Sequence, residues 1–78
     1  MQNLLLSDMR QGQRGTVTAI RLSGGFRQRL RDLGLIEDTE VTCMHIAPAG
    51  SPMAFWIRGA VIALRREDCA AVSVTGVA

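Results

Sequence analysis

The chain has 78 residues, of which 47% are hydrophobic and 21% are charged. A chain this short can form only one small core, and its composition is that of a globular domain, which excludes disorder and the larger enzyme folds. Nine basic residues, all arginine, stand against seven acidic ones, and this net charge of +2 is too small to indicate a nucleic-acid-binding surface. We therefore treat residues 1–78 as one domain.

The first two predicted elements are a strand and a helix. Residues 15–22 are rich in β-branched side chains, which is typical of a strand. In the next block Phe26, Leu30 and Leu33 recur at the spacing of one helical face. Gly34 follows, where the C-terminus of a helix favours a residue with positive φ. We therefore expect a short helix that turns these three apolar side chains to one side.

A β-hairpin is predicted from residues 53–58 and 61–64. Gly59 and Ala60 form the two-residue connection, and glycine in the first position fits a type II′ turn. Side chains alternate between the two faces of a strand. The face expected to form the core carries Met53, Phe55, Ile57, Ile62 and Leu64. The opposite face carries Trp56, Arg58, Val61 and Ala63.

Two further strands complete the predicted sheet. Residues 40–47 form a strand after a turn, and residues 71–75 form the last strand after a helical turn at 65–70. Five short strands in so few residues must curl to enclose a core, because a flat sheet would leave its apolar face uncovered. The expected fold is mainly β: a small SH3-like barrel of five strands, with one short helix after the first strand and a helical turn before the last. An oligonucleotide-binding Greek-key barrel is the alternative.

The sequence predicts a cytoplasmic protein. The N-terminus lacks a positive region, and its apolar run, residues 4–6, is too short for a signal peptide. No stretch approaches the roughly 18 apolar residues of a membrane span. The two cysteines, Cys43 and Cys69, are therefore expected to be reduced thiols.

One residue pair suggests metal binding. Cys43 and His45 lie two positions apart on a predicted strand, so both are expected on one face, where they could ligate Fe²⁺ or Zn²⁺. Two ligands do not complete a zinc site, and the competing interpretation is a buried cysteine beside a histidine without a ligand role. Because His45 is the only histidine, no convincing nucleophile–base pair can be assembled, and an enzyme is not expected.

Two surfaces are candidates for partner binding. Trp56 and Val61, with Arg58 beside them, place apolar surface where a solvated sheet carries polar residues, and aromatic and arginine side chains are enriched at interface hot spots. Burial of Trp56 under the N-terminal segment or a barrel strand is the alternative. Arg27 and Arg31 give the helix a basic outer side. A platform of exposed aromatic rings is missing, so nucleic-acid binding is not expected, although a small RNA-binding barrel stays an alternative function.

The order and spacing of several short segments resemble those of the ferrous iron transport protein A (FeoA) family. The segments are residues 30–35, 40–42, 47–53, 57–59 and 63–66. The resemblance covers residues 4–75 and departs from the family at residues 37–38, Glu-Asp, where Pro-Gly is frequent. It implies an SH3-like barrel and a small cytosolic accessory protein, which binds and regulates the membrane ferrous iron permease, ferrous iron transport protein B.

The resemblance carries over no catalytic residue, because none is established for the family. The membrane is expected to be reached only through the permease. If Trp56 and Val61 are exposed, self-association into a homo-oligomer is a further expectation. A transition-metal-binding or metal-sensing module, using Cys43 and His45, is the alternative function.

Overall fold

A computed structural model of the protein describes residues 2–77. Within this range the chain forms six strands, two short α-helices and one 3₁₀ turn. In chain order they are β1 (Gln2–Leu5), η1 (Leu6–Asp8), β2 (Arg14–Ile20), α1 (Gly24–Asp32), β3 (Glu40–Ile46), β4 (Met53–Ile57), β5 (Ala60–Leu64), α2 (Arg66–Cys69) and β6 (Val72–Val77).

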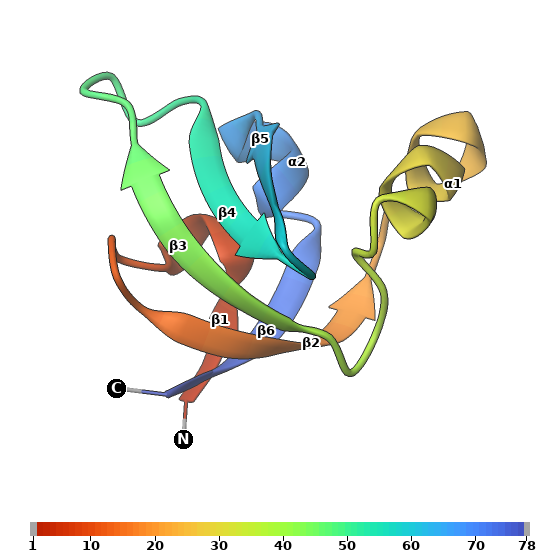
Figure 1. The fold of residues 1–78 in the computed structure, drawn as a ribbon, viewed down its shortest axis with the longest axis horizontal. Coiled ribbons are helices and arrows are strands. Elements are labelled where there is room, and N and C mark those ends of the chain that lie inside the picture. The colour runs from red at the N-terminus through yellow and green to blue at the C-terminus, as the bar shows by residue number, and fades with distance from the viewer. Residues whose placement is uncertain (1, 78) are drawn as a thin grey trace.

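The strands form one curled antiparallel sheet in the order β1-β6-β2-β3-β4-β5 (Figure 1). This is the expected mainly-β, SH3-like barrel, with the helix and the helical turn in their predicted places. The sixth strand, β1, was not predicted. It is four residues long and gains its partner only from β6, at the other end of the chain, so local sequence periodicity does not reveal it.

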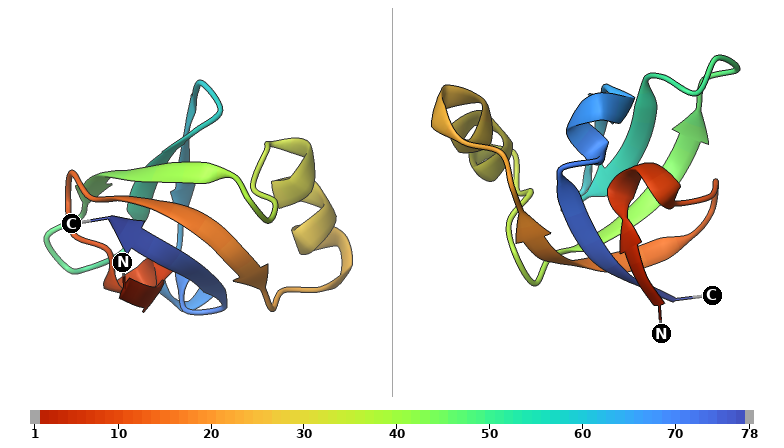
Figure 2. Two further views of the ribbon diagram at one scale, coloured as in Figure 1. Left: turned by 90° about the horizontal axis from the view of Figure 1, so that it is seen from below. Right: turned by 180° about the vertical axis from the view of Figure 1, so that it is seen from behind.

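The barrel is partly open, and short helical segments bridge its two edge strands. The edges are β1 and β5, which do not pair with each other. η1 follows β1 and α2 follows β5, and these two segments lie against each other (Figure 2). Leu6 of η1 and Cys69 of α2 are both fully buried. Apolar contact between the two segments therefore links the edges where no strand pairing does.

The inner face of the β4–β5 hairpin forms much of the core. Its members are Met53, Phe55, Ile57, Ile62 and Leu64, and all of them are buried, as predicted. Burying one such side chain contributes roughly 1.5–3 kcal/mol. The hairpin is therefore a main source of the stability of this small domain.

The connection of the hairpin differs from the prediction by one residue on each strand. Trp56 pairs with Val61, so the connecting residues are Arg58 and Gly59, not Gly59 and Ala60. Arg58 has φ 48° and Gly59 has φ 85°, as a type I′ turn requires. The prediction of a type II′ turn is therefore wrong. A type I′ turn has positive φ at both connecting residues, and its backbone twist matches the right-handed twist of the two strands. Each residue of β4 thus pairs with a residue of β5 two positions earlier than predicted. A shift of two residues returns every side chain to the same face, so the same side chains still face the core.

Helix α1 stands to one side of the barrel (Figure 1). Leu30 is buried, and Phe26 packs against the core. Leu33, predicted on the same apolar face, is instead 46% exposed. The helix ends at Asp32, and Gly34 then reverses the chain with φ 105°, so that the next residue, Leu35, enters the core in place of Leu33.

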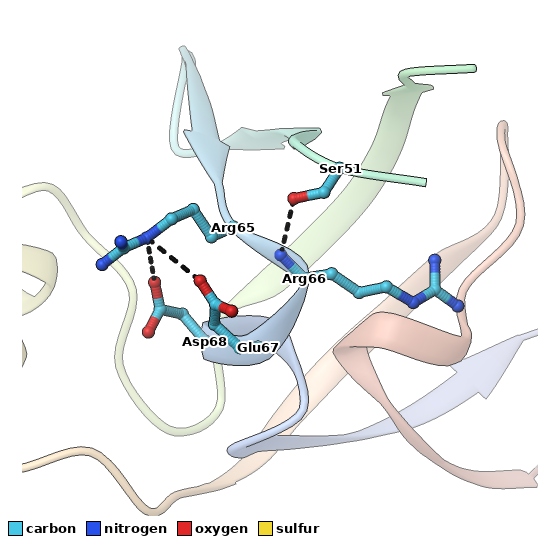
Figure 3. Close-up of polar contacts among 5 residues, drawn as sticks. All are labelled: Ser51, Arg65, Arg66, Glu67 and Asp68. Carbon is cyan, nitrogen blue, oxygen red and sulfur yellow. Dashed lines mark hydrogen bonds and ion pairs between the residues drawn. The ribbon is translucent and has the colours of Figure 1, made fainter. Parts of the chain in front are cut away.

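A loop far away in sequence holds the start of α2. The backbone N–H of Arg66 donates a hydrogen bond to the hydroxyl of Ser51 at 3.1 Å (Figure 3). The Arg66 guanidinium also donates to the carbonyl of Gly50 at 3.3 Å. Ser51 thus satisfies a donor that the first turn of a helix leaves free, the role that an N-cap residue usually plays.

Candidate interaction surface

Trp56 and Val61 form an exposed apolar pair on the outer side of the hairpin. They are directly opposite each other on β4 and β5. Trp56 is 45% exposed and Val61 is 57% exposed. The prediction that both face outward is confirmed, and the alternative that the N-terminal segment or a barrel strand buries Trp56 is wrong. β1 instead pairs with β6.

The strand registers extend this pair into a row across the sheet. Trp56 is opposite Thr42 of β3, and Thr42 is opposite Arg14 of β2. Arg14 is exposed, so the row runs from an apolar edge at Val61 to a cation at Arg14. Only the strand register reveals that Arg14 shares a row with Trp56, so Arg14 was not predicted as a contact residue.

We use the term outer hairpin face for one set of side chains on β3, β4 and β5. It consists of Thr42, Ala54, Trp56, Val61 and Ala63, with the exposed His45 opposite Ala54 and the exposed bulge residue Met44 beside it. Met44 is 47% exposed, slightly more than Trp56. Three of the four large apolar side chains that the described chain leaves exposed therefore lie on or beside this face. Exposed apolar surface that is concentrated on one face is typical of a protein interaction site.

Arg58 lies at the tip of the hairpin and not on its flat face. Its side chain packs over Gly34, where an added Cβ would lie 2.9 Å from the Arg58 Cδ. This contact brings the C-terminal end of α1 against the hairpin tip. Arg58 remains exposed, and no carboxylate among residues 2–77 forms an ion pair with it. It can therefore offer its charge to a partner.

The two helical arginines are separate from the outer hairpin face. Arg27 forms an ion pair of 3.4 Å with Glu37, in the segment between α1 and β3. Arg31 is exposed in the last turn of α1. Because α1 stands beside the barrel (Figure 1), these two residues lie on a different element from the outer hairpin face.

The structure does not place Cys43 and His45 on one face. Cys43 is fully buried, whereas His45 is exposed. The register of β3 against β4 shifts between these residues, so that Met44 forms a bulge and the alternation of side chains breaks. The prediction of a shared face is wrong for this reason. Among residues 2–77, no three His, Cys, Asp or Glu side chains come together as a metal site.

Both cysteines are core residues. Burial raises the pKa of the Cys43 thiol above its usual range. Burial, with a smaller contribution from the Asp68 carboxylate, raises the pKa of Cys69 to about 12. Thiols with raised pKa values stay protonated at neutral pH and are poor nucleophiles.

A shallow hollow lies over β1, β2 and β6, at the other end of the sheet from the hairpin. Its lining includes Asn3, Thr18 and Ser73. The charged residue in it, Asp8, accepts a hydrogen bond from the backbone N–H of Leu5 at 3.2 Å. Asp8 therefore has a structural role. No helix in residues 2–77 is long and apolar enough to cross a membrane.

Comparisons with known proteins match the whole barrel. The family model for the FeoA domain matches residues 4–76. The chain is 29% identical over 69 residues to an Fe(2+) transport protein A/Fe(2+) transporter FeoB fusion protein of Porphyromonas gingivalis. That alignment covers 88% of this chain but only 8% of the fusion protein.

Two solved structures are also similar. The solution structure of a FeoA protein from Chlorobium tepidum has a TM-score of 0.90 and 29% identity, covering 96% of this chain and 71% of that chain. The crystal structure of Stenotrophomonas maltophilia FeoA, complexed with zinc, has a TM-score of 0.76 and 25% identity, covering 91% of this chain and 88% of that one. That protein is described as an SH3 domain protein and put forward as a ferrous iron transport activating factor.

Proposed function

Because this chain belongs to the FeoA domain family, which is associated with ferrous iron transport, we propose that it is an accessory protein that binds and regulates the membrane ferrous iron transporter, ferrous iron transport protein B. In this role it works in the cytoplasm and meets the membrane only through the transporter.

The fusion protein of P. gingivalis is the observation that carries the proposal. In that relative, a FeoA-type segment and the transporter share one polypeptide. A covalent link keeps two parts at a high effective concentration, which favours an interaction that separate chains must achieve by affinity. Because this chain spans only 8% of the fusion protein, transport itself belongs to the remainder of that polypeptide.

The outer hairpin face supplies surface for such binding. Trp56 has the residue type most often found at interface hot spots, and Val61 extends its apolar area across the hairpin. Arg58 and Arg14 add exposed cations near the two ends of this surface. The basic side of α1, with Arg27 and Arg31, is a second predicted contact.

A binding measurement tests the proposal. The wild-type chain is titrated against the purified soluble cytoplasmic region of the transporter and against the full transporter in detergent. We expect Trp56→Ala to weaken binding about tenfold or more, the loss of a hot-spot side chain. Leu33→Ala is the matched control, because Leu33 has nearly the same exposure but lies at the end of α1. If the wild type binds neither form of the transporter, the proposal is wrong.

The zinc complex of the S. maltophilia relative supports a second candidate, a metal-binding module. In this chain the buried Cys43 cannot join the exposed His45 in one site without rearrangement, so His45 would need other ligands. Titration of Fe²⁺ and Zn²⁺ against the wild type and His45→Ala tests this candidate. Equal metal binding by the two proteins would remove His45 from it.

A further inference from the structure

The edge strand β5 has a free row of backbone hydrogen-bonding groups. It is the last strand of the sheet and pairs only with β4. In a two-residue hairpin the residues that flank the turn, here Ile57 and Ala60, exchange both hydrogen bonds, and bonded and non-bonded pairs then alternate. Trp56 and Val61 are therefore a non-bonded pair. The N–H and C=O groups of Val61, and of Ala63 two residues later, point away from β4.

The hydrogen bonds of β3, the other neighbour of β4, support the assignment of Trp56 and Val61 as a non-bonded pair. The N–H of Cys43 donates to Gln13 at 2.9 Å, and its C=O accepts from Gly12 at 2.7 Å, so the backbone of Cys43 points away from β4. The backbone N–H and C=O groups of the neighbouring residue, Thr42, must then point toward β4, where Thr42 pairs with Trp56. The backbone groups of Trp56 are thus used by β3 and leave Val61 unbonded.

β5 lacks the features that protect natural edge strands. Such strands usually carry a charge, a proline or a bulge, or are covered by another element. The β5 sequence, Ala-Val-Ile-Ala-Leu, has no charge and no proline, and its register with β4 is unbroken. No described residue outside β4 forms a backbone hydrogen bond with Val61 or Ala63. At the other edge, β1 is only four residues long and ends in η1.

The free edge and the outer hairpin face are continuous. Val61 and Ala63 carry the free backbone groups, and their side chains are exposed on that face. An added strand would therefore gain main-chain hydrogen bonds from β5 and apolar contact from Val61 and Trp56. This combination is how sheet-edge peptide recognition obtains both affinity and specificity.

The charges around β5 favour a particular occupant. Arg58 precedes the strand and forms no ion pair with a carboxylate in residues 2–77. Two arginines follow the strand: Arg65, which pairs with Glu67 and Asp68, and Arg66, which begins α2 and donates to the carbonyl of Gly50 at 3.3 Å. A second copy of β5, paired antiparallel about Ile62, would bring the arginines that follow one β5, Arg65 and Arg66, toward Arg58 at the start of the other, and like charges brought together are destabilising. A segment with an apolar centre and acidic ends would instead meet a cation at each end.

We propose that β5 binds an extended segment of the transporter as an added strand, and that this segment has alternating apolar residues in its centre and acidic residues at its ends. The proposal rests on the proposed function and goes further, because it specifies the backbone edge that binds and the chemistry of the bound segment.

The experiment removes one backbone N–H donor from the free edge of β5 and leaves the hydrogen bonds between β4 and β5 intact. Ala63→Pro eliminates an N–H that β4 does not use, and proline is tolerated in edge strands. Ala63→Ser is the matched control, because it keeps the N–H and a small side chain. We expect Ala63→Pro to bind the soluble cytoplasmic region of the transporter about tenfold more weakly than the wild type, and Ala63→Ser to bind as the wild type does.

Amide hydrogen exchange on the wild type tests the proposal without any substitution. In the free chain, the amides of Val61 and Ala63 should exchange fast, whereas those of Ile62 and Leu64, bonded to β4, should be protected. Addition of the transporter region should protect Val61 and Ala63.

The outcomes separate the two proposals. If the wild type binds the transporter region but Ala63→Pro binds equally well and both amides stay unprotected, strand addition is overturned and the proposed function stands. If the wild type does not bind, both fall. Sedimentation that shows a dimer, together with protection of the two amides in the free chain, would mean that a second copy of this chain occupies the edge of β5. The proposal that a transporter segment binds there would then be overturned.

Discussion

Trp56 and Val61 face each other on the outer side of the hairpin, and the adjacent pair, Phe55 and Ile62, faces the core. Two neighbouring aromatic residues of one strand therefore have opposite roles. Phe55 is fully buried and contributes to stability, whereas Trp56 exposes 45% of its surface, which is available for binding. The alternation of one strand thus separates the folding role of the hairpin from its recognition role.

This separation predicts very different effects of two alanine substitutions on stability. Phe55→Ala should lower the free energy of unfolding by about 3–5 kcal/mol, because it leaves a cavity in the core. That is comparable to the total of roughly 3–5 kcal/mol that a single core of this size supplies, so this variant should be largely unfolded at 25 °C. Trp56→Ala should remove about 1 kcal/mol or less, the value of one exposed cross-strand pair.

Urea denaturation followed by circular dichroism measures both effects. The wild type is the reference for the free energy of unfolding, and Trp56→Ala must stay folded for its binding results to be interpreted. A Trp56→Ala variant as unstable as Phe55→Ala would show that the indole is part of the core.

The hairpin turn predicts a stabilising substitution. Arg58 has φ 48°, a conformation that is unfavourable for most residues but that asparagine adopts more easily. Arg58→Asn creates the Asn-Gly sequence preferred in type I′ turns, and it should raise the free energy of unfolding by roughly 0.5–1 kcal/mol. Arg58→Ala keeps the unfavourable φ and is the control, with no gain expected. Thermal denaturation of the two variants and the wild type checks this, and an Arg58→Asn variant with a lower melting temperature would contradict it.

The sequence predicts which side chains of the hairpin face the core, but it does not predict how the hairpin turns. The alternation of apolar residues is local and has a period of two, so it identifies Phe55 as buried and Trp56 as exposed. The turn was misassigned because Gly59 fits either the first position of a type II′ turn or the second position of a type I′ turn. Only the pairing of Val61 with Trp56 distinguishes them.

Features that depend on tertiary context were not predicted correctly. Leu33 fits the helical period, but the reversal at Gly34 leaves it outside the core. The exposed His45 was assigned to the face of Cys43, because a bulge leaves no mark in the sequence pattern. The candidate surface was found from Trp56, whose exposure breaks the expected polar pattern, whereas the free edge of β5 follows only from the strand order.

The link between Ser51 and α2 predicts a remote capping effect. Ser51→Ala removes the acceptor of the Arg66 N–H, and loss of an N-cap hydroxyl typically lowers stability by about 1 kcal/mol (Figure 3). Ser51→Thr keeps a hydroxyl and should be close to the wild type. Arg65→Ala is a second comparison, because the Arg65 side chain is 73% exposed and its ion pairs with Glu67 and Asp68 should contribute little.

Urea denaturation of the three variants orders these contributions. We expect Ser51→Ala to be the least stable of the three. If Arg65→Ala is destabilised more than Ser51→Ala, the ion pairs and not the remote cap hold the start of α2.

The buried thiol of Cys69 predicts a loss of stability in alkali. Its pKa is raised from the ordinary 9.0 to about 12, chiefly by burial, so the folded chain keeps this proton after the unfolded chain has lost it. Between those two pH values the unfolded state binds fewer protons, and the free energy of unfolding must therefore fall as the pH rises. Urea denaturation at pH 8, 9 and 10 should show this decline in the wild type and a shallower one in Cys69→Ala, where the Cys43 thiol, whose pKa is also raised, still titrates. Parallel declines in the two proteins would mean that the thiol of Cys69 does not keep its proton in the folded core over this range.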